Sequence, residues 1–169
     1  MTKLLSRAAA LVFLAVLAAC GSKPEPTPPF YRDLASPTAR VDAATAAQFI
    51  STYRMQNGLG GLTLDPALQR AAEAQAGAMA AANDVNASRS AENNLKARLA
   101  NAGTGEVYAV ENVSAGYRTF AEAFSGWRES PKHNAVMLDA RATRMGIATA
   151  YVPGSKYKVF WSLVLATDK

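Results

Sequence analysis

Few side chains in this sequence could carry out catalysis, covalent modification or tight metal binding. Cys20 is the only cysteine and His133 the only histidine. The sequence contains no Ser-His-Asp order, no glycine-rich phosphate loop and no paired-histidine motif. Two well-placed groups are enough for general acid-base catalysis, so His133 with a carboxylate is one candidate. A tight zinc site is not favoured, because such sites use about four ligands, or three with an open position.

The first twenty residues have the order of an export signal. Lys3 and Arg7 form a basic start, residues 8–19 are apolar without a charge, and small residues precede Cys20. A membrane-spanning helix needs ~20 apolar residues, and this run is shorter. We therefore expect residues 1–19 to be a signal peptide that is removed.

The quartet Leu17-Ala18-Ala19-Cys20 resembles the bacterial lipobox. That motif implies acyl chains such as palmitate on Cys20, through a diacylglyceryl group on the thiol and acylation of the new amino terminus. Two or three chains hold a protein at a membrane, since each buried methylene contributes roughly 0.8 kcal/mol. The alternative is an ordinary secretory signal with an incidental cysteine. Lipidation would use the only thiol and leave the folded part without a disulfide.

The mature chain is expected to form a tether followed by one domain. Residues 20–40 start with a proline-rich stretch that should be semi-extended, at ~3 Å per residue. Phe30, Tyr31 and Leu34 could dock on the domain instead. Residues 41–169 have the length and apolar content of a single domain.

The charge balance argues against nucleic acid as a partner. The whole chain carries a formal charge of +5, from 18 basic and 13 acidic residues, and two basic residues leave with the signal. The basic residues that remain form no run and accompany no aromatic-rich motif. Weak attraction to anionic envelope polymers or headgroups is compatible with this balance.

Hydrophobic spacing and capping residues predict helices in the first half of the domain and a mixture of helices and strands in the second. The expected helices run from Asp42 to Asn57, from Asp65 to Met79, from Leu95 to Gly103, and from the Thr119-Glu122 capping box to Ser130. The expected strands are Val107–Ala115, Met145–Val152 and Tyr157–Ala166, the last covered on both faces. His133 would lie in a short turn after Pro131. This order predicts an α+β fold.

Four motifs occur in sequence order in the domain. They are Tyr53–Met79, Glu111-Asn112-Val113, Trp127–Asn134, and Met145-Gly146 with the aromatic strand around Trp161. Together they resemble the CAP superfamily of cysteine-rich secretory proteins, antigen 5 and pathogenesis-related proteins, and within it the disulfide-free bacterial SCP-like branch. The resemblance covers about residues 44–166. It implies an α-β-α sandwich, with a small, mostly antiparallel sheet between helices and a central cleft.

In many members of this superfamily the cleft carries two histidines and two glutamates that can hold a divalent cation. Glu111 matches the signature glutamate, although Val110 replaces the glycine before it, and His133 matches the later histidine. Glu129 is only near the position of the second glutamate, and the other histidine is absent. The resemblance therefore implies at most a weak divalent site at Glu111, Glu129 and His133, with Glu106 as a further ligand and no other cofactor.

Each of these residues also has a structural interpretation. Glu111 could accept backbone hydrogen bonds that tie its strand to a helix end. His133 could be a cleft-wall imidazole paired with Glu111 or Glu129, and such a pair would raise its pKa. Tyr117 is a candidate for the rim of the cleft, or simply a loop aromatic.

The sequence leaves several functions open. The first is a non-enzymatic module, held at the membrane through Cys20, whose cleft binds a lipid, a peptide or a cell-wall ligand. The second is a hydrolase with Glu111 as general base and His133 as acid or metal ligand, which requires both in one open cleft. A purely structural lipoprotein is a third. Gly21 rather than aspartate follows the cysteine, so the resemblance to lipoprotein sorting rules favours the outer membrane, facing the periplasm, if the cell has two membranes.

Overall fold

The computed structural model describes residues 25–87 and 90–168, so the signal peptide and Cys20 lie outside the described residues. The helices are η1 (Pro29–Tyr31), α2 (Ala43–Gln56), α3 (Pro66–Ala82), η3 (Ala91–Asn93), α4 (Leu95–Asn101), α5 (Phe120–Glu129) and α6 (Pro131–Met137), where η marks a short 3-10 helix. The strands are β1 (Thr63–Leu64), β2 (Ala109–Ala115), β3 (Arg144–Tyr151) and β4 (Val159–Ala166). Within the described ranges no helix is both long and apolar enough to cross a bilayer.

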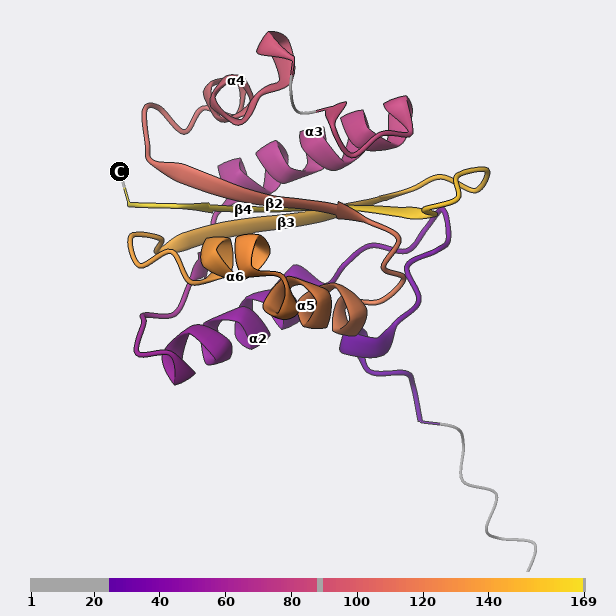
Figure 1. The fold of residues 1–169 in the computed structure, drawn as a ribbon, viewed down its shortest axis with the longest axis horizontal. Coiled ribbons are helices and arrows are strands. Elements are labelled where there is room, and N and C mark those ends of the chain that lie inside the picture. Colours follow the sequence, from indigo (N-terminus) through magenta and orange to yellow (C-terminus); the bar gives the residue numbers. More distant parts are fainter. Residues whose placement is uncertain (1–24, 88–89, 169) are drawn as a thin grey trace, which may run out of the picture.

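The four strands form one sheet in the order β1-β3-β4-β2. The short β1 runs parallel to β3, and the other two pairings are antiparallel. Figure 1 shows α3 and α4 on one side of the sheet and α2, α5 and α6 on the other. The predicted α+β sandwich with a mostly antiparallel sheet is therefore confirmed.

Strand β4 is the centre of both cores, and each of its residues is buried. Because side chains alternate along a strand, its residues divide between the two faces. Trp161, Leu163 and Leu165 pack in the core beneath α2, α5 and α6. Val164 and Ala166 pack in the core beneath α3 and α4.

Helix α3 lies directly on the sheet at Gly146 of β3. A Cβ atom there would overlap the backbone of Leu68 and Gln69, so only glycine permits this approach. The amide side chain of Gln69 also exchanges two hydrogen bonds with the backbone of Ile147, at 2.9 and 3.1 Å. Helix α3 therefore covers one face of β3 and satisfies part of its outer edge.

Three helices begin at the capping residues that the sequence predicted. The predicted caps Asp42, Asp65 and Thr119 each accept a hydrogen bond from a backbone N–H in the first helical turn. Such caps contribute ~1 kcal/mol each. Pro131 opens α6, which is a helix of seven residues and not merely a turn, because proline is well suited to a first helical position.

The packed part of the chain begins earlier than residue 41. Leu34 is buried, with 3% of its surface exposed, and Phe30 packs against the core beneath α2 and α5. The ring of Phe30 stacks on Phe49 with centroids 4.2 Å apart. On α2, Ile50 is fully buried, whereas the neighbouring Phe49 is 39% exposed.

Candidate functional site

Glu111 lies in the middle of β2 and faces the layer of α3 and α4. Its partner in the ladder is Val164, which packs in that core. The carboxylate forms an ion pair with Arg98 of α4, whose side chain is almost completely buried. Arg98 also donates to the side-chain oxygen of Gln75 on α3 at 2.7 Å. The pair thus joins β2 to both helices of this layer.

Burial dominates the electrostatics of this pair. It raises the pKa of Glu111, and the charge of Arg98 lowers it by less. Burial likewise lowers the pKa of Arg98, and Glu111 opposes that shift. Removing one partner of a buried ion pair leaves an uncompensated charge in a poorly solvated site, which is strongly destabilising. The Glu111 carboxylate is therefore committed to the side chain of Arg98 and ties strand to helix through that ion pair, rather than through the backbone hydrogen bonds that the sequence interpretation expected.

His133 lies on α6, in the layer on the other side of the sheet (Figure 1). The side-chain amide of the neighbouring strand residue Asn112 donates to the His133 carbonyl at 2.9 Å. Burial lowers the pKa of the imidazole, and the backbone of Val113 raises it by less. Among the described residues no ion pair joins His133 to Glu111 or Glu129. The pairing expected from the sequence is absent there, and the pKa shift has the opposite sign.

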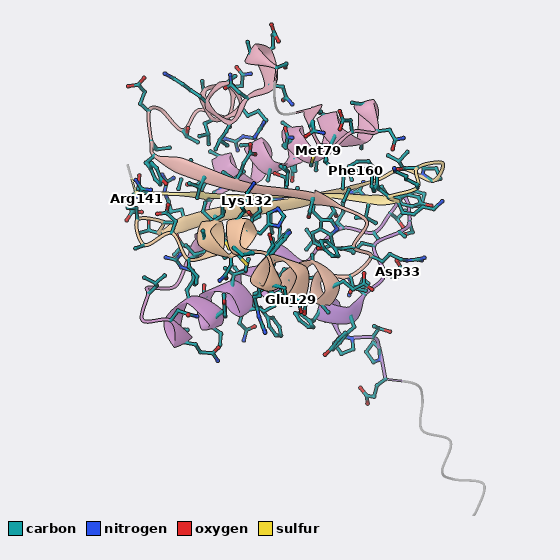
Figure 2. The ribbon with its side chains drawn as sticks, viewed as in Figure 1. Asp33, Met79, Glu129, Lys132, Arg141 and Phe160 are labelled. Atoms are coloured by element: carbon teal, nitrogen blue, oxygen red, sulfur yellow. The ribbon has the colours of Figure 1, made fainter. Side chains whose placement is uncertain are left out.

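The other two predicted site residues also lie away from Glu111. Glu129 is exposed at the end of α5, on the far side of the sheet from α3 (Figure 2). Tyr117 packs against Gly126 of α5, and its carbonyl accepts a hydrogen bond from the Trp161 indole at 2.8 Å. Tyr117 therefore contributes to the core rather than to a cleft around Glu111.

The sequence offered four possible metal ligands: Glu106, Glu111, Glu129 and His133. They do not form a metal centre in this geometry. In residues 25–87 and 90–168, no three His, Cys, Asp or Glu side chains form a group that could hold a metal ion. Glu106 pairs instead with Lys96, at 3.7 Å, on the surface. A hydrolase that uses Glu111 and His133 together would need them in one cleft, and the sheet register directs Glu111 to the face opposite α6.

A groove lies between α4 and the beginning of β2, with a volume of about 860 Å³. Its lining residues are Leu95, Lys96, Leu99, Ala100, Gly105, Glu106, Val107, Tyr108 and Ala109. Most of these are apolar, and the Lys96–Glu106 ion pair adds charge at the surface. A second cavity, between α3 and the edge of β3, is smaller, at about 350 Å³. We call the larger one the α4–β2 groove.

One wall of the groove is held by a polar cluster around Tyr108. The Tyr108 hydroxyl donates to Asp139 at 2.6 Å, and the Arg141 guanidinium lies 3.4 Å from the centre of the Tyr108 ring. The hydrogen bond from Arg141, with that from Tyr108, lowers the pKa of Asp139 to about 2. The ring is therefore fixed from the loop between α6 and β3, although it remains 36% exposed.

Sequence reasoning did not find Arg98 or the groove. A signal for Arg98 was present, because it follows Leu95 by three residues and so shares the apolar face of a helix. The groove has no comparable signal. It depends on how α4 sits against the start of β2, and two glycines with positive φ, Gly103 and Gly105, shape the connection between them.

The family model CAP: Cysteine-rich secretory protein family matches residues 48–165. The chain belongs to this family. The matched range of this CAP protein contains no cysteine despite the family's name. No curated protein sequence matches the chain.

Solved structures share the fold at low sequence identity. An extracellular protein containing an SCP domain from Bacillus anthracis str. Ames is 21% identical, with a TM-score of 0.64 over 75% of this chain and 40% of that one. An outer surface protein from Borrelia burgdorferi is 13% identical, with a TM-score of 0.62 over 75% and 92%. A cysteine-rich secretory protein from Staphylococcus aureus subsp. aureus Mu50 is 17% identical, with a TM-score of 0.56 over 75% and 38%. The CAP chain thus spans less than half of the Bacillus and Staphylococcus proteins.

Proposed function

We propose that this CAP protein is a lipid-anchored module of the cell envelope that binds a ligand in the α4–β2 groove and performs no catalysis with Glu111 and His133. The observation that carries the proposal is the groove itself. Its volume of about 860 Å³ is within the range of ligand sites, and apolar side chains with a few polar groups are the usual lining of such sites.

The lining favours an amphipathic ligand. Leu95 and Leu99 offer an apolar helix face, while Lys96 and Glu106 offer both signs of charge at the surface. A lipid, a peptide or a cell-wall fragment combines apolar and polar groups in this way. Tyr108, fixed by Asp139 and Arg141, provides a rigid wall at little entropic cost on binding.

The envelope location is supported by the sequence and by the names of two relatives. Leu17-Ala18-Ala19-Cys20 follows a short basic and apolar signal. Two solved relatives are described as an extracellular protein and an outer surface protein. If Cys20 is lipidated, Cys20→Ser should move the protein from the membrane to the soluble fraction. Membrane association that persists in Cys20→Ser would contradict the anchor.

The groove is tested by filling it. Ala100 is an exposed residue of α4 that lines the groove, so Ala100→Trp should block the site without disturbing the core. The control is Ala81→Trp, an exposed alanine of α3 outside the groove. Wild type and both variants would be purified from envelopes in mild detergent and analysed by native mass spectrometry. We expect a bound small molecule in wild type and in Ala81→Trp and its loss in Ala100→Trp. Equal ligand content in all three would exclude the groove.

A further inference from the structure

Three aromatic side chains form an exposed patch where the tether enters the domain: Phe30, Tyr31 and Phe49. Tyr31 is 60% exposed and Phe49 39% exposed. The Phe30 ring connects them, because it stacks on Phe49 at 4.2 Å and meets Tyr31 edge-on at 5.0 Å. We call these three residues the aromatic patch.

The aromatic patch is held rigidly on the domain. Phe30 meets the buried rings of Phe120 and Phe124 edge-on, with centroids 5.4 and 6.5 Å away. Phe49 belongs to α2, a helix of fourteen residues with a capped start. The patch therefore exposes apolar surface from an ordered platform.

Two basic groups that form no ion pair among the described residues lie close to the patch. Arg32 directly follows Tyr31, and Arg128 lies 5.5 Å from the centre of the Phe124 ring. Neither forms an ion pair with another described residue. Aromatic rings flanked by free cations are typical of surfaces that rest in the interface of a lipid bilayer.

The length of the tether keeps the patch near the membrane. Nine residues, Cys20 to Pro28, connect the lipidated position to the start of η1. Whatever its conformation, a chain of nine residues spans at most roughly 30 Å. The aromatic patch starts at the second residue of η1, so it is the part of the domain with the shortest covalent distance to the anchor.

We propose that the aromatic patch is a docking surface for the lipid bilayer that carries Cys20, and that it turns the α4–β2 groove away from that bilayer. This proposal rests on the lipid anchor of the proposed function. In Figure 1, η1 and α2 lie on one side of the sheet, and α4 lies on the other. A domain that sits on η1 and α2 presents its groove to the space beyond the membrane. The ligand of that groove is then a cell-wall fragment or a peptide, and not a lipid of the same leaflet.

Docking can be measured without the acyl chains. Cys20→Ser protein would be mixed with phosphatidylethanolamine–phosphatidylglycerol vesicles and sedimented. We expect measurable binding, weakened about ten-fold by Tyr31→Ser with Phe49→Ser, the effect of losing roughly 60 Å² of apolar contact. Met55→Ser is the matched control, because Met55 is 58% exposed on α2 and is outside the patch. Equal binding of all three proteins, or no binding by the lipid-free protein, would overturn the docking surface.

Orientation is tested in the lipidated protein. Since Cys20 is the only cysteine, a fluorophore can be placed at Thr52→Cys on α2 or at Ala100→Cys on α4. With a quencher on the lipid headgroups, we expect strong quenching at position 52 and little at position 100. Equal quenching would refute the orientation. Failure of the anchor would appear separately, as wild-type protein in the soluble fraction, and the vesicle experiment with the lipid-free protein would still test the patch.

Discussion

The two faces of the sheet are built from different side chains. Toward α2, α5 and α6, the sheet packs large rings, among them Trp161 against Trp127 with centroids 6.0 Å apart. Toward α3 and α4, the core consists mostly of alanine with a few larger residues. Small side chains let α3 lie directly on Gly146. The same layer holds the buried Arg98–Glu111 pair and the α4–β2 groove.

This difference gives the two sides different roles: the aromatic layer contributes most to stability, and the alanine-rich layer carries the groove. Aromatic pairs bury large areas and contribute ~0.5–1.5 kcal/mol each beyond that burial, which suits the side that carries the predicted tether. Helix α4 is short and is anchored to this layer through its buried residues Arg98 and Leu99, and the α4–β2 groove lies between it and the start of β2. We therefore expect substitutions in the aromatic layer to change stability most, and those on the groove side to change binding as well.

The largest loss of stability is expected at Arg54, in the layer of α2, α5 and α6. This arginine of α2 is 1% exposed and donates to the carbonyls of Gly60, Met137, Asp139 and Ala142, at 2.8 to 2.9 Å. Arg54→Met would leave all four carbonyls without this donor, and hydrogen bonds to charged groups contribute about 1.5–3 kcal/mol each. We expect the free energy of unfolding to fall by about 5 kcal/mol in urea denaturation, which is less than the sum of the four bonds because methionine avoids the cost of desolvating a buried charge.

Two further variants make the Arg54 result interpretable. Arg128→Met removes the same charge from the exposed face of α5 and should change stability little. Arg54→Lys keeps the charge but loses the planar fork, so it should be intermediate and should fold if Arg54→Met does not. Wild-type stability in Arg54→Lys would mean that the four carbonyls find other partners.

Glu111→Gln tests the groove side and should have a smaller effect. The variant leaves Arg98 buried without a counter-charge, yet the new carboxamide can still accept a hydrogen bond from it. We expect a loss of about 3 kcal/mol, the lower end for a broken buried pair. Glu129→Gln is the matched control, because Glu129 is exposed and forms no ion pair with another described residue.

The double variant Arg98→Met with Glu111→Leu sharpens this test. Apolar residues of similar size often replace a buried ion pair at no cost. We expect the double variant to regain most of the stability that Glu111→Gln loses. If it is as unstable as the single variant, the layer depends on the polar contacts with Gln75 and not on charge balance.

For His133 we expect a still smaller effect on stability. The direction of its pH dependence distinguishes a buried imidazole from one paired with a carboxylate. Burial lowers the pKa of this imidazole below its usual value. The unfolded chain then binds the proton more readily, so the stabilising contribution is full above pH ~6.5 and falls as the pH drops through the lowered pKa. A carboxylate partner would raise the pKa and reverse this slope.

The measurement is simple because the chain has one histidine. The imidazole pKa would be read from its NMR resonances, and the unfolding free energy would be compared between pH 7 and pH 5. We expect His133→Gln to remove the part of the slope that comes from the imidazole, and any slope that remains to come from carboxylates such as Glu111, whose pKa burial raises. A pKa above the usual value would instead support the pairing with Glu111 or Glu129 that the sequence indicated.

Local features of the sequence predicted the fold well, and long-range contacts limited the prediction of the site. The caps at Asp42 and Asp65 depend on neighbours within three residues, so they could be recognised directly. The burial of Arg54 depends on carbonyls up to 88 residues away, which no local pattern reveals. Likewise, the face that Glu111 occupies is set by its register with β4, and only that register separates it from His133.

The smallest expected effect concerns metal ions. The family resemblance suggested a weak divalent site, but the sheet register directs Glu111 away from the layer that holds His133 and Glu129. A carboxylate already bound to Arg98 would also have to exchange that partner for the cation. We therefore expect no saturable heat when zinc, calcium or magnesium is titrated into the protein. Saturable binding that disappears in both Glu111→Gln and His133→Ala would show that the two residues meet in solution. The assignment of Glu111 and His133 to opposite faces of the sheet would then be wrong.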